Sequence, residues 1–293
     1  MSRILITGAA RGIGAESARR LAARGHSLAL LGLEGELLEE VAASCGRATA
    51  YEVDVTDHDA LDDTMARAIE GLGGLDVVVA NAGIASGGTV RSMDPEMWEK
   101  VIAVNLIGVY RTVRAALPSL IESRGYALPV ASAAAIAHAP LMSAYCASKA
   151  GVEAFADSLR IEVAHHGVDV GCAYFSWIDT EMVRGADRLS AFDAMRKSLR
   201  WPVSKTYPVS AAADVVVAGI EGRSKRVMAP GWLRYGQWLR GTLETSTRKE
   251  AVKTMPEVER LWEAEVAERG ASAASAPVGA GGEAALKDVA LPK

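Results

Sequence analysis

Several features that mark other classes of protein are scarce in this sequence. Of its 293 residues only 5% are aromatic, and the three cysteines, Cys45, Cys146 and Cys172, lack the spacing of metal ligands. Few and scattered thiols are typical of a reduced protein and not of a disulfide framework or a metal centre. The formal net charge of −4, without a basic stripe, argues against a nucleic-acid surface.

Long apolar runs are also lacking. By inspection, no stretch approaches the roughly 20 apolar residues that span a bilayer, and MSRILITG leads straight into a strand without a signal peptide. These absences predict a cytoplasmic protein without membrane association. The chain does have 50% hydrophobic residues and 28 glycines, which predict a large aliphatic core joined by tight turns.

Two periodicities alternate over the first 175 residues. Amphipathic stretches of helical length separate short aliphatic runs typical of buried parallel strands, at 3–7, 27–32, 48–53, 75–81, 126–132 and 168–174. This alternation predicts an α/β fold with a doubly wound, Rossmann-like parallel sheet. Pro129 lacks an N–H donor, so we expect the strand at 126–132 to be irregular or to start late.

The pattern predicts one domain with an extension. Residues 1–230 form the predicted dinucleotide-binding catalytic domain, which ends in a helix over 210–222 and a short strand over 225–230. A helical extension over 231–270, broken near Pro256, is expected to follow. Residues 271–293 are rich in Ala, Gly, Ser and Pro and have little to bury, which predicts disorder.

The glycine-rich stretch TGAARGIG, residues 7–14, lies between the first strand and a helix. Gly8 permits the sharp turn, Gly12 lets the backbone approach a pyrophosphate, and Gly14 lets the helix pack against the strand. Free N–H groups at the helix N-terminus favour an anion there. The stretch, with Ile13 inside it, therefore predicts a dinucleotide cradle.

A second motif, AYCASKAG, places Tyr145 one helical turn before Lys149. A nearby ammonium favours the phenolate and lowers a tyrosine pKa from about 10 toward the range of a useful base at neutral pH. Tyr110 and Arg114 have the same spacing, however. The pair alone therefore does not identify a catalytic site.

Four motifs together resemble the short-chain dehydrogenase/reductase family. TGAARGIG, ANAG at 80–83, VNLIG at 104–108 and YCASK at 145–149 occur in the family's order and at its spacings. The resemblance covers about residues 3–230, and the glycine spacing is that of the shorter, single-domain type. It implies an NAD(P)-dependent oxidoreductase that acts on a secondary alcohol or ketone.

The resemblance also implies roles for individual residues. Tyr145 would exchange the proton, Lys149 would tune it and bind the nicotinamide ribose, and Ser132, 13 residues before Tyr145, would orient the substrate oxygen. Asn105 would hold a water of the proton relay; the alternative is a helix-interior amide bonded to backbone. For Tyr110 and Arg114 we expect a helix-surface pair.

Other positions resemble the family's cofactor contacts. Asp54 and Val55 would meet the adenine, unless Asp54 caps the next helix, for which Asp57 is better placed. The remaining positions would form the turn under the adenosine ribose or hold the nicotinamide carboxamide: Asn81, Ala82, Gly83, Ile178 and Thr180.

One part of the pattern departs from the family. Phe175 and Ser176 replace its usual Pro-Gly, and together with Trp177 they either reshape the pocket or serve packing.

The choice of dinucleotide depends on the end of the second strand. Gly32 and Leu33 occupy the positions of the family's usual acidic residue and its arginine neighbour. Arg11 resembles the basic residue of NADP-preferring members and favours NADP(H) over NAD(H). Glu34 leaves NAD(H) open, since a carboxylate there binds ribose hydroxyls; as the alternative, it is an N-terminal helix residue stabilised by the helix dipole.

The resemblance assigns residues 181–207 to a substrate lid. Its apolar side chains predict an alcohol or ketone with an apolar part, and residues 231–243 are expected to cover the pocket or an oligomer interface. The helices bearing Asn105 and Tyr145 would form a homodimer or homotetramer. A catalytically silent dinucleotide-binding regulator is the alternative function, although it would not need the Asn–Ser–Tyr–Lys set.

Overall fold

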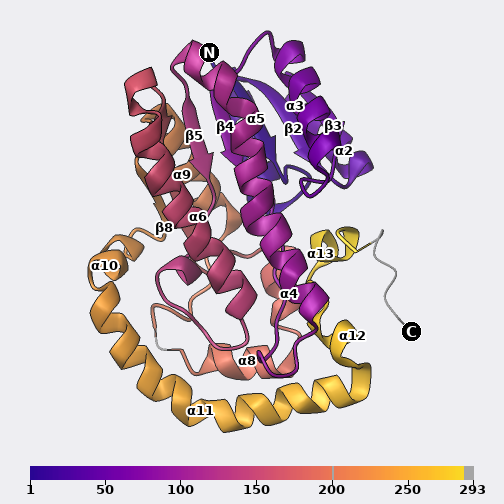
Figure 1. Cartoon of the computed structure of the whole chain (residues 1–293), viewed down its shortest axis with the longest axis vertical. Helices are drawn as coiled ribbons and strands as arrows, with labels where there is room; N and C mark the ends of the chain where they lie inside the picture. The colour runs from indigo at the N-terminus through magenta and orange to yellow at the C-terminus, as the bar shows by residue number, and fades with distance from the viewer. Residues whose placement is uncertain (200, 287–293) are drawn as a thin grey trace.

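The computed structural model describes residues 1–199 and 201–286, with the backbone alone over 242–250. Within them, helices cover both faces of a parallel sheet (Figure 1). Six strands pair in the order β3-β2-β1-β4-β5-β6, and β7 pairs with β8. This confirms the predicted doubly wound sheet. The bounds are β1 Arg3–Thr7, β2 Ser27–Gly32, β3 Ala48–Glu52, β4 Val77–Ala80, β5 Tyr126–Pro129, β6 Asp169–Val170, β7 Cys172–Phe175 and β8 Arg226–Ala229.

The run 168–174 is not one strand, as expected, but two that are divided at Gly171. A side chain at Gly171 would lie 2.1 Å from the Tyr126 hydroxyl, so only glycine fits there. The N–H of Val130 donates to the Ala80 oxygen on one side of the strand, and the N–H of Ala131 donates to the Ala173 oxygen on the other. Because successive N–H groups of a strand alternate in direction, the N–H that Pro129 lacks would point to the same side as that of Ala131, toward the break at Gly171. The bridge between Val130 and Ala173 connects the two sheets beyond it.

Alternate side chains of each strand enter two separate cores. Leu5 packs with helices α3, α5 and α6 on one face, whereas Ile4 and Ile6 pack with α1, α2 and α9 on the other. The helix bounds are α1 Gly12–Ala23, α2 Gly35–Cys45, α3 His58–Leu72, α4 Pro95–Ile102, α5 Gly108–Ser123, α6 Ser143–Glu162 and α9 Val209–Glu221. The cysteines are free, with Cys146 and Cys172 buried.

Helices α4 and α5 join through the π-helical turn η1, Ala103–Ile107, into one stretch from Pro95 to Ser123. By length and composition this stretch is apolar enough to cross a membrane, which corrects our expectation that none is. It packs against α3, α6 and strands β4 and β5. These contacts bury 44% of its most apolar 18-residue window, and the rest of that window remains outside the core.

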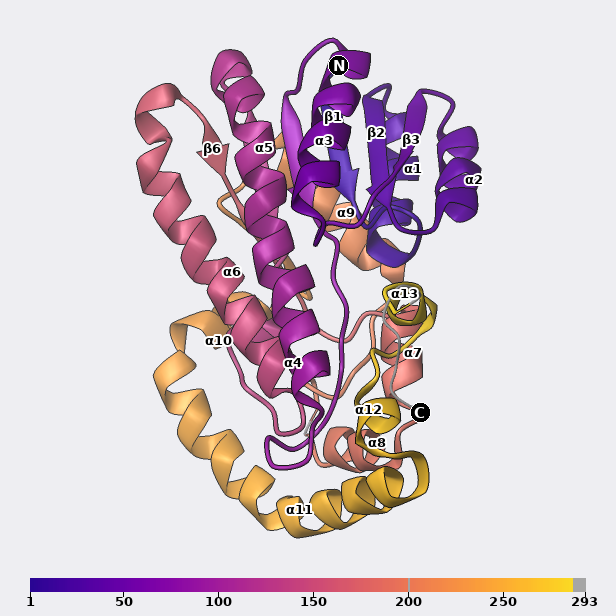
Figure 2. The same ribbon diagram turned by 45° about the vertical axis from the view of Figure 1, so that its right-hand side comes forward.

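The predicted lid contains helices α7, Glu181–Ala186, and α8, Ser190–Lys197. Phe192 and Met195 of α8 are buried in a third apolar cluster with Trp262. Trp201, by contrast, is mostly exposed. The lid is therefore held from below by the C-terminal part of the chain, where α11 packs along α8 (Figure 2).

Residues 233–286 form what we call the C-terminal strap: α10 Leu233–Trp238, α11 Arg240–Arg269, α12 Ala271–Ser275 and α13 Ala280–Ala284. It curves around the foot of the molecule and returns toward the sheet (Figures 1 and 2). The expected break near Pro256 is wrong, because α11 continues through this residue and the helices instead separate at Leu239.

The expected disorder after residue 270 is also wrong as far as residue 286; residues 287–293 lie outside the described part. Ala274 and Ser275 are buried, and Ala285 joins the main core. The small side chains that predicted disorder instead allow close backbone approach. A Cβ at Gly279, for example, would lie 2.7 Å from the Glu181 carbonyl oxygen.

Trp262 provides a test of how firmly the strap is held. Its side chain is 1% exposed and donates from Nε1 to the Ser92 hydroxyl at 2.9 Å. We expect Trp262→Ala to lower the free energy of unfolding by about 3–5 kcal/mol, as for other buried aromatics. Trp238, which is 93% exposed, is the matched control. Trp238→Ala should change the free energy of unfolding by less than about 0.5 kcal/mol. Urea unfolding of both variants would show equal losses if the strap were not packed.

Candidate active site

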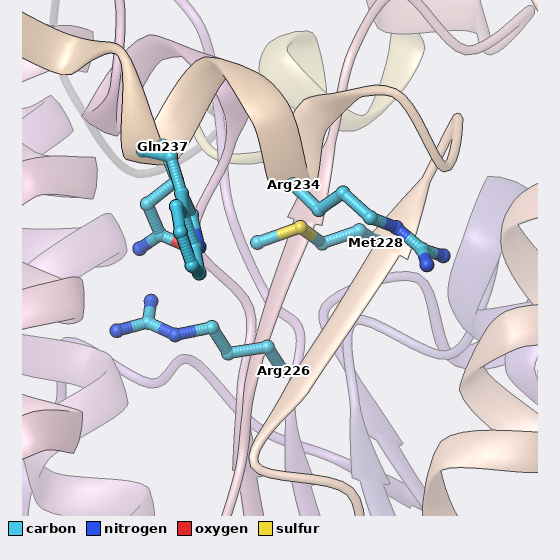
Figure 3. Close-up of a pocket in the computed structure, with 5 residues that line it drawn as sticks. Arg226, Met228, Arg234 and Gln237 are labelled. Carbon is cyan, nitrogen blue, oxygen red and sulfur yellow. The ribbon is translucent and has the colours of Figure 1, made fainter.

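Two hollows compete as the candidate site. The larger, about 570 Å³, lies beside α10, and Figure 3 shows the Arg226 and Arg234 side chains pointing in opposite directions there. None of the predicted site residues lines it. The other, about 240 Å³, lies at the carboxyl ends of the central strands, where α/β proteins bind ligands. It is the candidate active site.

This 240 Å³ cavity brings together all but two of the predicted residues. Gly14 and Asn105 lie behind its wall, where they support residues that do line it. The predicted residues that line it are Gly8, Arg11, Gly12, Ile13, Gly32, Leu33, Asp54, Val55, Asn81, Ala82, Gly83, Ser132, Tyr145, Lys149, Ile178 and Thr180.

The glycine loop has the shape expected of a phosphate cradle. Gly8 has φ +64°, and a Cβ on it would lie 2.8 Å from Ala82 Cα; one on Gly14 would lie 2.3 Å from the Gly8 oxygen. Helix α1 begins at Gly12, and the Arg11 side chain makes no capping hydrogen bond to it. The first N–H groups of α1 are thus left for an anion, so this loop fits a pyrophosphate.

Asn81 fixes this loop to the neighbouring strand. Its Nδ2 donates to the Thr7 and Gly8 carbonyl oxygens at 3.0 and 3.1 Å. The Thr7 hydroxyl in turn accepts from the N–H groups of Asn81 and Ala82, each at 3.1 Å. The turn predicted to underlie the adenosine ribose therefore also holds the ends of β1 and β4 together.

The catalytic candidates converge from two elements. Ser132 follows β5, donates to the Phe175 carbonyl oxygen at 3.3 Å and accepts from Ala134 N at 3.1 Å. Tyr145 and Lys149 lie on α6, with Lys149 Nζ 5.7 Å from the phenol ring centroid. Lys149 is buried and donates to the Val130 carbonyl oxygen at 2.9 Å. The ammonium is thereby held beside the phenol.

Burial opposes the expected lowering of the tyrosine pKa. It raises the pKa of the Tyr145 phenol, and the side-chain interaction with Ser132 counters only part of that rise. The same burial lowers the pKa of Lys149 to about 8. Desolvation disfavours both charged forms. It keeps the Tyr145 phenol neutral and makes the Lys149 ammonium lose its proton more readily.

Asn105 lies in the π-helical turn and is fully buried. Its Oδ1 accepts from Ile84 N at 2.8 Å, and its Nδ2 donates to the Ile84 oxygen at 2.9 Å and the Ser148 hydroxyl at 3.2 Å. Both amide hydrogens are used, which favours the alternative of an amide bonded to backbone. Asn105 positions the segment after β4 against α6.

Arg11 does not present a free cation to the cavity that it lines. Its guanidinium binds the Glu34 carboxylate at 2.6–2.8 Å and the Glu181 carboxylate at 2.7 Å. Glu34 therefore fits neither alternative as expected. Its carboxylate is not free to turn toward a ribose, and it does more than face the dipole of α2, because it binds Arg11. Two carboxylates against one guanidinium leave this cluster with a net charge of −1.

The departure from the family pattern after β7 has two structural outcomes. Phe175 is buried in the core below the sheet and offers its carbonyl oxygen to Ser132. Trp177 packs in the lid cluster, edge-on to Phe192 at 5.7 Å and under the Arg196 guanidinium at 4.8 Å. Phe175 thus packs in the core and, with Ser176, also lines the 240 Å³ cavity, whereas Trp177 packs in the lid cluster.

The remaining alternatives resolve plainly. Asp57 caps α3, and Asp54 accepts from Thr56 N at 2.7 Å while it lines the cavity. Tyr110 is 49% exposed and packs edge-on against Phe155, and Arg114 pairs with Asp62. Tyr110 and Arg114 are therefore surface residues, as expected, and not a second catalytic pair.

One wall of the cavity consists of residues that the sequence did not predict for the site. Val278, Gly281, Gly282 and Ala285 of the strap line it, beside Glu181, Met182 and Val183 of α7. The segment 231–243, expected to cover the pocket, instead lies away from it, with Trp232 Nε1 bonded to the Tyr207 hydroxyl at 3.1 Å. Only the alternation of Gly and Ala near the C-terminus hinted at close packing there.

Known proteins share this arrangement. A family model described as short chain dehydrogenase matches residues 2–189. An uncharacterized NAD-dependent oxidoreductase of Mycobacterium tuberculosis (strain CDC 1551 / Oshkosh) is 33% identical over 206 residues, 64% of this chain and 75% of that protein. The levodione reductase structure (TM-score 0.73, 25% identity) covers 79% of this chain and 96% of its own. A variant of actinorhodin polyketide ketoreductase with NADPH (TM-score 0.71, 27% identity) covers 79% and 97%.

The Lys149 pKa predicts a pH dependence of stability. The folded chain releases this proton near pH 8, whereas an unfolded lysine does so near pH 10.4. The unfolded state thus binds more protons between these values, and stability rises with pH. Relative to Lys149→Met, the wild-type free energy of unfolding should gain about 2 kcal/mol between pH 7 and 9.5. Parallel urea titrations of both proteins that keep a constant difference would contradict this pKa.

Proposed function

Since this chain belongs to the short-chain dehydrogenase family of NAD(P)-dependent oxidoreductases, we propose that it interconverts a secondary alcohol and a ketone with Tyr145 as general acid and base. One observation carries the proposal. Ser132, Tyr145 and Lys149 line the same cavity as the glycine loop. The dinucleotide, when bound, supplies or accepts the hydride.

The residues of the cavity would divide the remaining work. The N-terminus of α1 holds the pyrophosphate, and Asp54 lies at the adenosine end. Ser132 orients the substrate oxygen toward the Tyr145 hydroxyl. The raised pKa of this phenol keeps it protonated at neutral pH, ready to donate its proton to a forming alkoxide. Lys149, fixed by the Val130 oxygen, stabilises the phenolate that remains.

For the dinucleotide we propose NAD(H), against the preference for NADP(H) that Arg11 alone suggests. The Arg11 guanidinium is already paired with Glu34 and Glu181, and the cluster has a net negative charge. A 2′-phosphate would meet these carboxylates, whereas ribose hydroxyls donate to them. The mycobacterial relative is an NAD-dependent oxidoreductase by name, in agreement with this choice, whereas the ketoreductase variant was solved with NADPH.

The substrate we propose is a small alcohol or ketone with an apolar part. Support comes from Trp177, Phe192 and Met195 in the cluster next to Tyr145, and from relatives such as the meso-2,3-butanediol dehydrogenase of Serratia marcescens. A homodimer or homotetramer remains part of the proposal. Large apolar side chains exposed on η1, α5 and α6 favour it: Ile107, Tyr110 and Ile161.

The general acid/base assignment predicts a specific loss of turnover. With the alcohol or ketone that the wild type converts fastest, Tyr145→Phe should lower kcat/KM by about 10²–10⁴-fold. NADH binding should stay within about threefold, because the hydroxyl acts on the substrate. Tyr110→Phe, at the matched surface pair, should leave turnover unchanged. Retention of full turnover by Tyr145→Phe would refute the role and favour a silent dinucleotide-binding regulator.

The charge cluster predicts the cofactor preference and how to change it. By nicotinamide fluorescence, the wild type should bind NADH at least about tenfold tighter than NADPH, or about 1.4 kcal/mol. Glu34→Gln removes one of the two carboxylates paired with Arg11 and brings the cluster from a net charge of −1 to neutrality, so it should narrow or reverse this preference for NADH. Glu36→Gln, on the exposed first turn of α2, is the control and should leave it unchanged. A wild type that prefers NADPH would restore the original interpretation of Arg11.

A further inference from the structure

We propose that residues 276–286, the roof segment of the strap, form part of the cofactor site and close over the bound dinucleotide, so that its release requires the segment to lift. The inference rests on the proposed function, since it concerns the same cavity. It assigns a binding role to a part of the chain that lies beyond the family match, which ends at residue 189.

The roof segment lines the cavity without filling it. Val278, Gly281, Gly282 and Ala285 share the cavity with the glycine loop at one end and with Ser132 and Tyr145 at the other. None of these four brings a long side chain into the space. The groove therefore stays continuous beneath the segment, as a ligand-binding site requires and a plugged site would not.

Anchors on the loop after β4 hold the segment in place. Val278 N donates to the Ala85 carbonyl oxygen at 2.8 Å. The fully buried Ser275 accepts at its hydroxyl from Asp94 N at 3.2 Å and at its carbonyl oxygen from the Ser86 hydroxyl. These bonds tie the roof to residues that follow the ribose turn in sequence.

A second contact joins the roof to the lid and to the glycine loop. Gly279 has φ +77°, and a Cβ on it would lie 2.7 Å from the Glu181 oxygen and 2.9 Å from Met182 N. Figures 1 and 2 show α13 beside the carboxyl edge of the sheet, and it packs on α7. Glu181 also binds Arg11. Displacement of the roof would thus loosen the phosphate end of the site.

The roof is the wall of the cavity that can move most easily. With the segment in place the cavity is about 240 Å³ and is partly open to solvent. Displacement of this wall is the step that would free a bound dinucleotide. The roof is the wall made of small residues and few hydrogen bonds, and such segments open more easily than core elements.

The test is the rate at which NADH leaves the full-length protein, followed by stopped-flow fluorescence with excess NAD⁺ as competitor. Gly279→Ala adds the clashing Cβ, so release should be at least about tenfold faster than from the wild type. Gly73→Ala is the matched control, because Gly73 also has a positive φ, +70°, but a Cβ there meets nothing within 4 Å. Its release rate should equal that of the wild type.

Other outcomes separate this inference from the proposed function. Equal NADH release rates for Gly279→Ala and the wild type would overturn only the proposed role of the roof segment. Tighter NADH binding by the variant would also overturn it, because the segment would then compete with the cofactor instead of retaining it. Absence of binding of both NADH and NADPH by the wild type would overturn both proposals. Should Gly279→Ala fail to fold, hydrogen exchange of the wild type decides: NADH should slow exchange over 271–286, and an unchanged rate would refute the roof.

Discussion

The hydrogen bonds of Asn81 to Thr7 and Gly8 are the contacts on which the site depends. They join β1 and β4, the two strands between which the order of a doubly wound sheet reverses. Crossovers leave these strand ends on opposite sides of a crevice, and the amide holds the glycine loop open across it. The same segment continues through Gly83 and Ile84 to Asn105, which couples the cofactor end to helix α6.

The catalytic pair shows how burial and charge compete. Proximity of an ammonium favours a phenolate, yet removal of both groups from water disfavours each charge. At Lys149 the second effect dominates and lowers its pKa to about 8, so the side chain is still mostly an ammonium at pH 7 and can attract a phenolate. In the site as folded, the buried phenol is therefore protonated and lies beside a group that can stabilise its anion.

Features that depend on neighbouring residues in the sequence could be predicted. Features that depend on contacts between residues distant in the sequence could not. The strands follow from aliphatic runs such as residues 3–7, and Gly8 and Gly14 from the steric demand of one turn, so both could be predicted. The Arg11–Glu34–Glu181 cluster joins residues 23 and 170 positions apart, and no periodicity reveals such a contact. The division at Gly171 likewise depends on the Tyr126 hydroxyl, which lies on another strand.

The strap illustrates a limit of composition as a guide to order. Small residues bury little apolar area, so a segment of Ala, Gly and Ser gains little free energy from burial alone. Here Gly279 and Gly185 approach within contact distance, which larger residues would prevent, and Ser275 accepts two hydrogen bonds, from Ser86 and Asp94. Order then rests on a few close contacts and not on a large apolar surface. A segment held in this way is stable enough to cover a ligand and weakly enough attached to release it.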